Sequence, residues 1–212
     1  MNKIKCFLTV ALVLSLAMAC KKDKYIKDTG LHETTTPLST YDYLKSGNQF
    51  DTLVNLINHF NLQDSVNKSA TFFAFTDYAI ATFMSNAGIA NIDALYDSVS
   101  SKFITQYMFG AKIGQPDLSL IPISYPNWGG AATVSQLYKT ENQQYVYLTS
   151  SAPAFQYYIT QYKSIIGKLD TNPNRPPNDP TDVIVPIQTT GLQTATGTLL
   201  NVFVNNGSLR KI

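Results

Sequence analysis

Charge and cysteine are both scarce in this chain of 212 residues. Charged residues make up 14% of it, whereas about a quarter is typical of soluble domains. Sixteen basic and 14 acidic residues give a net charge of +2, so the strong basic excess of a nucleic-acid-binding protein is missing. Two cysteines are too few for a disulfide scaffold. Aromatic residues, at 12%, are too frequent for a disordered chain.

Residues with catalytic or metal-binding chemistry are also sparse. The two histidines, His32 and His59, form no His-x-x-x-His pair and no Cys–His cluster. Motifs for a nucleophilic serine, a P-loop or a dinucleotide are absent from the sequence. Asp93 and Asp97 lie one helical turn apart, but an exposed helical face explains that spacing without acid–base chemistry. We therefore predict that the protein is not an enzyme, with no catalytic residues, no metal and no cofactor.

The first twenty residues have the layout of a secretory signal. Lys3 and Lys5 form a short positive segment, and residues 7–16 (FLTVALVLSL) form an apolar run. That run is too short to cross a bilayer, which needs about 20 apolar residues, and no later segment comes closer. We expect residues 1–19 to be a signal peptide and predict no transmembrane helix. Removing Lys3 and Lys5 leaves 14 basic and 14 acidic residues, so the mature protein is close to neutral.

Cys20 resembles the acylated cysteine of bacterial lipoproteins. The residues before it, LAMA at 16–19, are similar to a lipobox, although the family prefers Leu where this chain has Ala17. Ordinary secretion is the alternative, because Ala17 and Ala19 also suit the peptidase that releases soluble proteins. Lipidation is favoured because Cys6 leaves with the signal. Cys20 would otherwise be a lone exposed thiol in an oxidising compartment.

This resemblance implies an anchored protein of the Gram-negative cell envelope. Acyl chains such as palmitate on Cys20 would hold it stably in the outer membrane, on either the periplasmic or the surface face. Residues 20–38 comprise the lipidated cysteine and a flexible tether without apolar periodicity. As a coil, residues 21–38 span roughly 20–25 Å.

Apolar spacing predicts an α+β domain over residues 39–212. Helices are expected at 39–47, 49–60, 78–85 and 92–107, with Ser39 and Asp77 as N-caps and Gly47, Gly88 and Gly110 as stops. Thr71–Phe75 is predicted to be a buried strand. Further strands are predicted at 134–138, 145–149, 182–187 and 199–204.

Three segments resemble the conserved boxes of fasciclin domains. Residues 71–80 (TFFAFTDYAI) are similar to the first box, TVFAPTNEAF, with Phe75 in place of the usual proline. Residues 106–112 (QYMFGAK) and 196–202 (TGTLLNV) are similar to two later boxes, YHVVPGK and NGVIHVI, and follow in the right order. The resemblance covers about residues 38–212. It implies a β-sandwich wedge flanked by helices, enlarged here by a β/loop insertion at 113–182.

Adhesion and matrix contact are the roles that this family resemblance implies, and no general catalytic site belongs to the fold. Integrin-binding relatives owe adhesion to a Tyr-His pair. The matching residues here are Gln106 and Tyr107, which argues against that particular mode of adhesion. A fold does not by itself fix a function.

Tyrosine and tryptophan are concentrated in the insertion. Seven of the 13 tyrosines and the single tryptophan fall within residues 113–168. Our candidate ligand-binding residues are Tyr125, Trp128, Tyr145 and Tyr147, with Trp128 foremost because Pro, Asn and Gly around it indicate a loop. Such rings stack on sugars or anchor protein interfaces. The alternative is that these tyrosines pack locally as good strand residues.

We therefore expect a non-catalytic lipoprotein whose domain mediates adhesion or surface interaction. The alternative is an accessory module of an outer-membrane nutrient-uptake system that captures a glycan or a peptide. The expected partners are the membrane, through the lipid anchor, and a glycan or an extracellular or envelope protein, but not nucleic acid.

Overall fold

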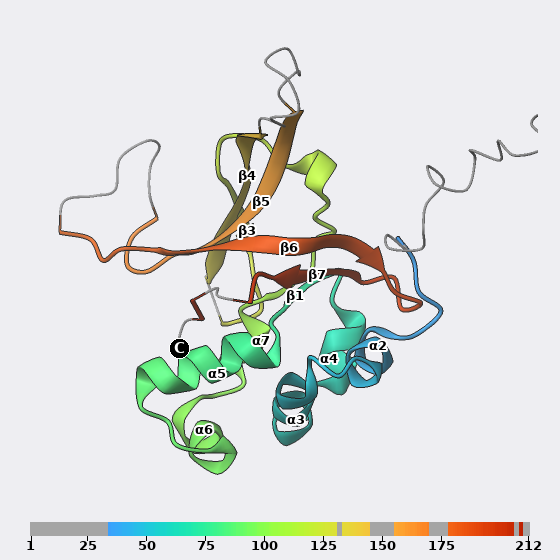
Figure 1. Cartoon of the computed structure of the whole chain (residues 1–212), viewed down its shortest axis with the longest axis vertical. Helices are drawn as coiled ribbons and strands as arrows, with labels where there is room; N and C mark the ends of the chain where they lie inside the picture. Colours follow the sequence, from blue (N-terminus) through green and yellow to red (C-terminus); the bar gives the residue numbers. More distant parts are fainter. Residues whose placement is uncertain (1–33, 131–132, 145–154, 170–177, 206–207, 210–212) are drawn as a thin grey trace, which may run out of the picture. The chain divides into compact units, whose positions relative to one another are not determined.

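The computed structural model describes residues 34–130, 133–144, 155–169, 178–205 and 208–209 (Figure 1). These residues form six α-helices and one mixed sheet of seven strands. The α+β class predicted from the apolar spacing is confirmed.

The helices precede most of the sheet in the chain and lie together on one side of β1 and β7 (Figure 1). They are α2 (Thr40–Ser46), α3 (Asp51–His59), α4 (Gln63–Lys68), α5 (Asp77–Ala87), α6 (Ile92–Ser98) and α7 (Lys102–Thr105). Ser39 caps α2 by accepting the N–H of Asp42, as predicted. Gly88 ends α5 with a φ of 68°, a conformation that glycine adopts without strain.

The prediction of one helix over residues 92–107 is wrong. The chain leaves helical geometry at Val99, where φ is −124° and ψ is 161°, and α7 begins three residues later. Val99 still buries its side chain. Apolar periodicity therefore continues across the break, and the pattern does not reveal it.

The prediction of Asp77 as the N-cap of α5 is also wrong. Thr76 takes that role, because its hydroxyl accepts the N–H of Ala79. The Asp77 carboxylate accepts the N–H groups of Asp51 and Thr52 instead, at 3.0 and 2.7 Å. It thus caps α3, a helix that has no side-chain cap of its own.

The sheet has the strand order β2-β1-β7-β6-β5-β4-β3. The strands are β1 (Thr71–Ala74), β2 (Met108–Phe109), β3 (Ile123–Pro126), β4 (Val134–Gln144), β5 (Phe155–Ser164), β6 (Val183–Gln193) and β7 (Leu199–Phe203). The predicted strands at 71–75, 134–138, 182–187 and 199–204 are confirmed and begin within one residue of β1, β4, β6 and β7, but β4 and β6 each continue six residues beyond the predicted end. The predicted strand at 145–149 lies outside the described residues. Strands β2, β3 and β5 were not predicted.

The sheet is bent into a nearly closed barrel instead of forming two separate layers. Strand β6 takes part in both halves: its first residues pair with β5, and the stretch from Ile187 pairs with β7. The pairing with β5 stops at Pro186, which lacks an N–H to donate. At the other side, a bridge between Phe109 and Asn127 joins the two ends of the sheet.

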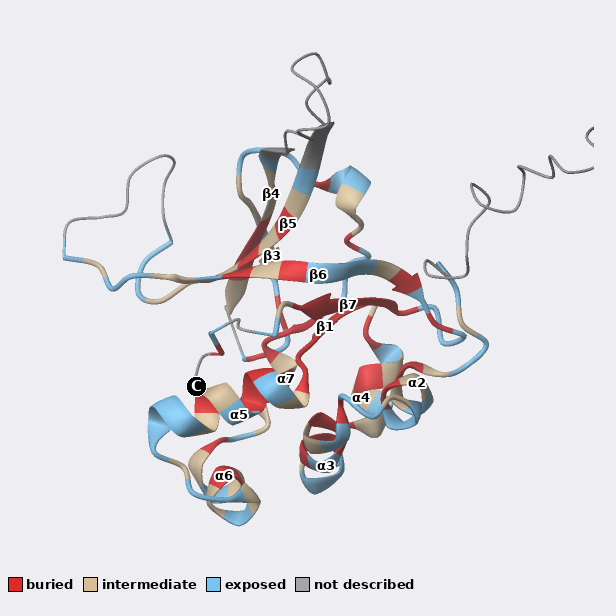
Figure 2. Cartoon of the chain, in the orientation of Figure 1, coloured by how far each residue is buried: buried red, intermediate tan, exposed pale blue. Residues whose placement is uncertain are grey.

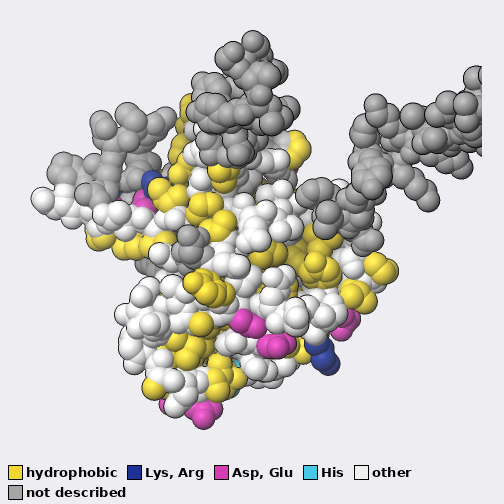
Figure 3. All heavy atoms as spheres, in the orientation of Figure 1, with side chains coloured by type: hydrophobic (Ala, Val, Ile, Leu, Met, Phe, Trp, Pro, Cys, Tyr) yellow, Lys and Arg dark blue, Asp and Glu magenta, His cyan; other side chains and the backbone are white. Residues whose placement is uncertain are grey.

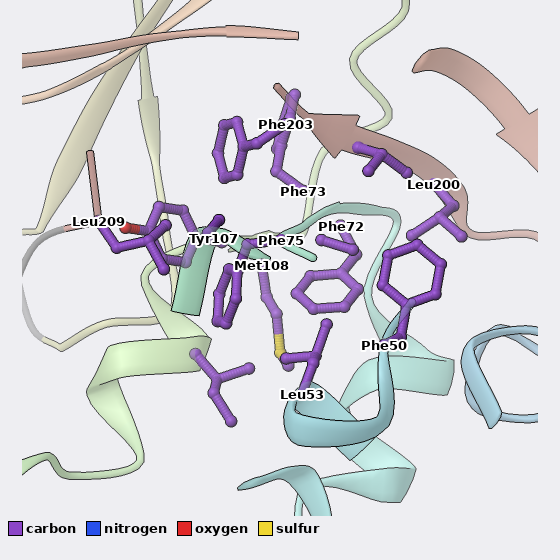
Figure 4. Packing of buried hydrophobic residues seen from close by; sticks show 14 of the residues in the cluster. Phe50, Leu53, Phe72, Phe73, Phe75, Tyr107, Met108, Leu200, Phe203 and Leu209 are labelled. Atoms are coloured by element: carbon purple, nitrogen blue, oxygen red, sulfur yellow. The ribbon is translucent and has the colours of Figure 1, made fainter. Parts of the chain in front are cut away.

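Aromatic rings fill the interior of the bent sheet (Figure 4). The ring of Phe203 lies 5.3 Å from those of both Tyr107 and Tyr162, and 5.9 Å from that of Phe73. All four side chains are almost fully buried. Strands β1 and β7 are buried along their whole length, between this aromatic core and the helices (Figure 2).

Residues 34–38, which the sequence assigns to the tether, are attached to the domain. The Gln193 N–H donates to the carbonyl of Thr34, the Thr36 N–H donates to the carbonyl of Gln193, and the Ala195 N–H donates to that of Leu38. The chain therefore enters the domain beside the end of β6.

Candidate binding site

The structure brings two of the four candidate ligand-binding residues together, Tyr125 at β3 and Trp128 just after it. Tyr145 and Tyr147 lie outside the described residues, as does Cys20. Strand β4, which precedes Tyr145, ends nine residues beyond Ser135, the partner of Tyr125. Nine strand residues span about 30 Å, so Tyr125 and the end of β4 do not belong to one compact site.

Tyr125 is packed partly against the core. It pairs with Ser135 on the face of the sheet that carries the core, and its ring is partly buried against the buried cluster. Burial raises the pKa of its hydroxyl above the ordinary value of 10.0, and the nearby Asp117 carboxylate raises it further. Local packing therefore covers part of this ring, and a binding role for Tyr125 stays a prediction.

Trp128 is the exposed residue of the pair. Its side chain is 39% exposed, while its backbone N–H donates to the Met108 carbonyl at 3.0 Å. A Cβ added to Gly110 would lie 3.6 Å from the indole nitrogen. The indole therefore lies over a residue without a side chain, and its backbone is bound to β2.

Asn127 fixes the turn that carries Trp128. Its side-chain amide donates to Ser135 Oγ at 2.8 Å, and its side-chain oxygen accepts from the Gly129 N–H and the Thr133 hydroxyl at 2.9 and 2.6 Å. Asn127 is 9% exposed, and hydrogen bonds are strong where water is excluded. The hydrogen bonds of the buried Asn127 side chain thus fix the conformation of the turn that includes Asn127 and Thr133.

The same network continues into the core. The hydroxyls of Ser135 and Tyr162 lie 2.7 Å apart, and Tyr162 donates to the carbonyl of Gln106 at 3.1 Å. A Cβ on Gly129 would lie 3.1 Å from both Cα and Cβ of Gln106. The turn therefore packs directly against the end of α7, and only a residue without a side chain fits there comfortably.

Gln106 and Tyr107, which match the adhesive Tyr-His pair of fasciclin relatives, are each 1% exposed. Tyr107 packs against Phe75 and Tyr162, with ring centroids 5.5 and 5.2 Å apart. The two side chains cannot contact a partner without unfolding, which agrees with the sequence argument against that mode of adhesion.

A second polar cluster was not singled out from the sequence. Lys163 Nζ lies 3.0 Å from Asp182 Oδ2, with the two side chains 13% and 4% exposed. The other Asp182 oxygen accepts the N–H of Ile166 at 2.6 Å. Burial raises the pKa of the neighbouring Tyr138, and the Lys163 ammonium partly offsets that rise. The ion pair joins β5 to the start of β6, so we assign it a structural role.

The remaining ionisable residues noted in the sequence take ordinary positions. Asp93 and Asp97 are exposed on α6. His59 stacks on Tyr96 with ring centroids 4.0 Å apart. Among the residues that the structure describes, no three His, Cys, Asp or Glu side chains gather into a set able to hold a metal ion. The same residues contain no helix long and apolar enough to span a membrane.

No protein family model matches the chain, and no curated protein matches it.

Proposed function

We propose that this chain is a non-catalytic lipoprotein of the Gram-negative cell envelope, anchored through Cys20, whose domain mediates adhesion or surface interaction by binding a partner at the turn that carries Trp128. The observation behind the proposal is the combination of an exposed tryptophan with a buried network that fixes its backbone. Rigidly mounted aromatic rings are typical anchors of binding surfaces, because little entropy is lost on binding.

The contacts among the three fasciclin-like segments support a fasciclin-like domain. Strand β1 comes from the first segment, β2 from the second and β7 from the third. Strand β1 pairs with both of the others, antiparallel with β2 and parallel with β7. Segments far apart in the chain therefore form the buried centre of one sheet, as is expected when they descend from one conserved core.

The binding role is tested with Trp128→Ala and, as a control, Tyr78→Ala, which removes an aromatic ring that is 63% exposed on α5. Both full-length variants are compared with wild type on arrays of glycans and of matrix and envelope proteins. We expect Trp128→Ala to weaken binding about tenfold or more, as for an interface hot spot, and Tyr78→Ala to have little effect. Equal binding by wild type and Trp128→Ala would refute the proposal.

The same arrays separate the two expected roles. Binding to matrix or envelope proteins favours adhesion, whereas selective binding to one oligosaccharide or peptide favours nutrient capture.

The anchor is tested separately by Cys20→Ser and cell fractionation. We expect the variant to leave the membrane fraction, and a variant that stays there contradicts lipidation.

A further inference from the structure

Helix α7 brings a lysine next to the turn that carries Trp128. Lys102 is exposed at the start of this helix, and a Cβ added to Gly130 would lie 3.9 Å from its Nζ. Gln106, just after the other end of the helix, packs against Gly129, where a Cβ would lie 3.1 Å from the Gln106 Cα. Both ends of α7 therefore contact the turn, and Lys102 has a defined place beside it.

The Lys102 ammonium has no carboxylate partner in the described part of the chain. The ion pairs found there join Lys68 to Asp64 and Lys163 to Asp182. Charged side chains are few on the face seen in Figure 3, in keeping with a chain of which 14% is charged. Within the described residues, the charge of Lys102 is therefore not neutralised by an ion pair.

Two further hydrogen-bond donors at the turn have no acceptor among the residues that the structure describes. They are the Trp128 Nε1–H and the Gly130 N–H, and both residues are exposed. In contrast, the Gly130 carbonyl accepts the Thr133 N–H at 3.3 Å, and the Asn127 side-chain oxygen accepts the Gly129 N–H at 2.9 Å. The turn uses these acceptors internally and presents donors to solvent, so it suits a ligand rich in acceptor oxygens.

The indole of Trp128 is accessible to a flat ligand. Its nitrogen lies over Gly110, and the two residues that follow it in the chain are Gly129 and Gly130. None of these three neighbours has a side chain that could cover the ring. Aromatic rings of this kind stack on the apolar faces of sugars, whose oxygens accept hydrogen bonds from nearby donors. The surface therefore favours a sugar as its ligand.

A peptide is the less favoured ligand. Extended peptides commonly bind by adding a strand to a free sheet edge, and β2 is the last strand of the sheet on this side. Its edge is already occupied, because Phe109 forms a bridge with Asn127 and the Met108 carbonyl accepts the Trp128 N–H at 3.0 Å. A peptide at this turn therefore has no strand of β2 to extend.

We propose that Trp128, Lys102 and the Gly130 N–H form one site for an acidic glycan, with a sugar ring stacked on the indole and a uronate carboxylate bound by the ammonium and the N–H. Gly130 follows Trp128 by two residues, at most about 7 Å of chain, so a short oligosaccharide reaches both. A carboxylate bound by an ammonium makes charge-assisted hydrogen bonds, which are stronger than neutral ones. The inference rests on the proposed function and names the class of its ligand.

The first test titrates acidic and neutral oligosaccharides into the full-length chain by calorimetry. The probes are oligomers of galacturonic acid, of mannuronic acid, and of glucuronic acid alternating with N-acetylglucosamine, each paired with its carboxyl-reduced counterpart. We expect at least one acidic oligomer to bind about fivefold more tightly than its neutral counterpart. The difference should shrink as salt rises from about 0.05 M to about 0.5 M. Equal affinity within every pair, no binding, or tighter binding of an oligoglutamate peptide overturns the proposal.

The second test locates the site on the surface. Lys102→Met removes the charge of an exposed side chain and keeps its length, and Lys45→Met makes the same change at an exposed position of α2 as the control. We expect Lys102→Met to lose the preference for acidic over neutral oligomers, Trp128→Ala to weaken the binding of both, and Lys45→Met to change neither. An acid preference that survives in Lys102→Met overturns this inference alone. Unchanged affinity in Trp128→Ala refutes the proposed function as well.

Discussion

At the scale of single residues, Asn127 determines how the candidate binding residue is presented. Its amide bonds Ser135, Gly129 and Thr133 at once, although it is 9% exposed. A buried asparagine between a proline and a tryptophan has no pattern that distinguishes it from an ordinary turn residue in the sequence. The turn was therefore predictable from the sequence, but its rigidity was not.

Replacement of Asn127 by alanine is expected to destabilise the fold by about 2–3 kcal/mol, because buried hydrogen-bonding groups lose their partner. The turn should loosen at the same time. The chain has one tryptophan, so its fluorescence reports on Trp128 alone and should shift to longer wavelength. Asn55→Ala, at an exposed position of α3, is the control for denaturant melts and spectra. Unchanged emission together with unchanged stability would mean that the network does not hold the turn.

The raised pKa of Tyr138 leads to a prediction about the free energy of unfolding at alkaline pH. Burial raises the pKa of Tyr138 above 10.0, and Lys163 partly opposes this. A raised pKa means that the folded state holds the proton more tightly than the unfolded state. The stabilisation is therefore present below about pH 10 and is lost as pH rises through the pKa of the folded state. We expect the free energy of unfolding to fall above pH 10, and to fall less in Tyr138→Phe than in Tyr78→Phe. Equal alkaline losses in the two variants would count against this account.

At the scale of elements, the helices depend on residues distant in the chain. Helix α3 begins without a cap of its own, and Asp77 supplies one from the start of α5. A carboxylate at a helix N-terminus satisfies free N–H groups and interacts favourably with the helix dipole.

Asp77→Ala is expected to lower the free energy of unfolding by about 1–2 kcal/mol, the usual cost of losing a cap. Asp77→Asn should cost less, because the amide oxygen still accepts a hydrogen bond. Asp93→Ala is the matched control, since Asp93 also lies in the first turn of a helix but is exposed. Denaturant melts of the three variants provide the measurement, and an Asp77→Ala loss no larger than that of Asp93→Ala would contradict the role.

Local signals in the sequence identified the elements that carry their own caps and stops. Ser39 and Gly88 are recognisable because a helix start and a helix end each need a particular residue type at one position. Strand β5 was missed because the polar and apolar residues of its sequence, FQYYITQYKS, do not alternate regularly. Its pairing with β4 is not encoded locally either. The break at Val99 was missed because a buried residue keeps the apolar spacing in either conformation. Contacts between residues far apart in the chain, such as that of Asp77 with α3, cannot be recognised from a local sequence pattern.

At the scale of the whole molecule, a short backbone seam attaches residues 34–38 to the domain. The tether runs parallel to the end of β6, with the Thr35–Gln193 bridge at its centre. If this seam opened, residues 34–38 would lengthen the tether and the domain would lose its defined exit point. The point at which the chain enters the domain therefore depends on a short backbone seam.

Thr36→Pro tests the seam, because it removes the N–H that donates to the Gln193 carbonyl at 2.9 Å. Thr35→Pro is a matched control: the Thr35 N–H makes no hydrogen bond in the described residues, so proline there removes none. Thr36→Val controls for the lost hydroxyl, which accepts the Leu38 N–H at 3.3 Å. We expect hydrogen exchange at the Gln193 amide, bonded to Thr34, to accelerate in Thr36→Pro and to stay slow in both controls. Global stability should change little, because the seam lies at the domain's edge and local opening costs less than unfolding. Equal exchange in all three variants would show that the seam is not held by its backbone bonds. The tether would then extend as far as Thr40, where α2 starts.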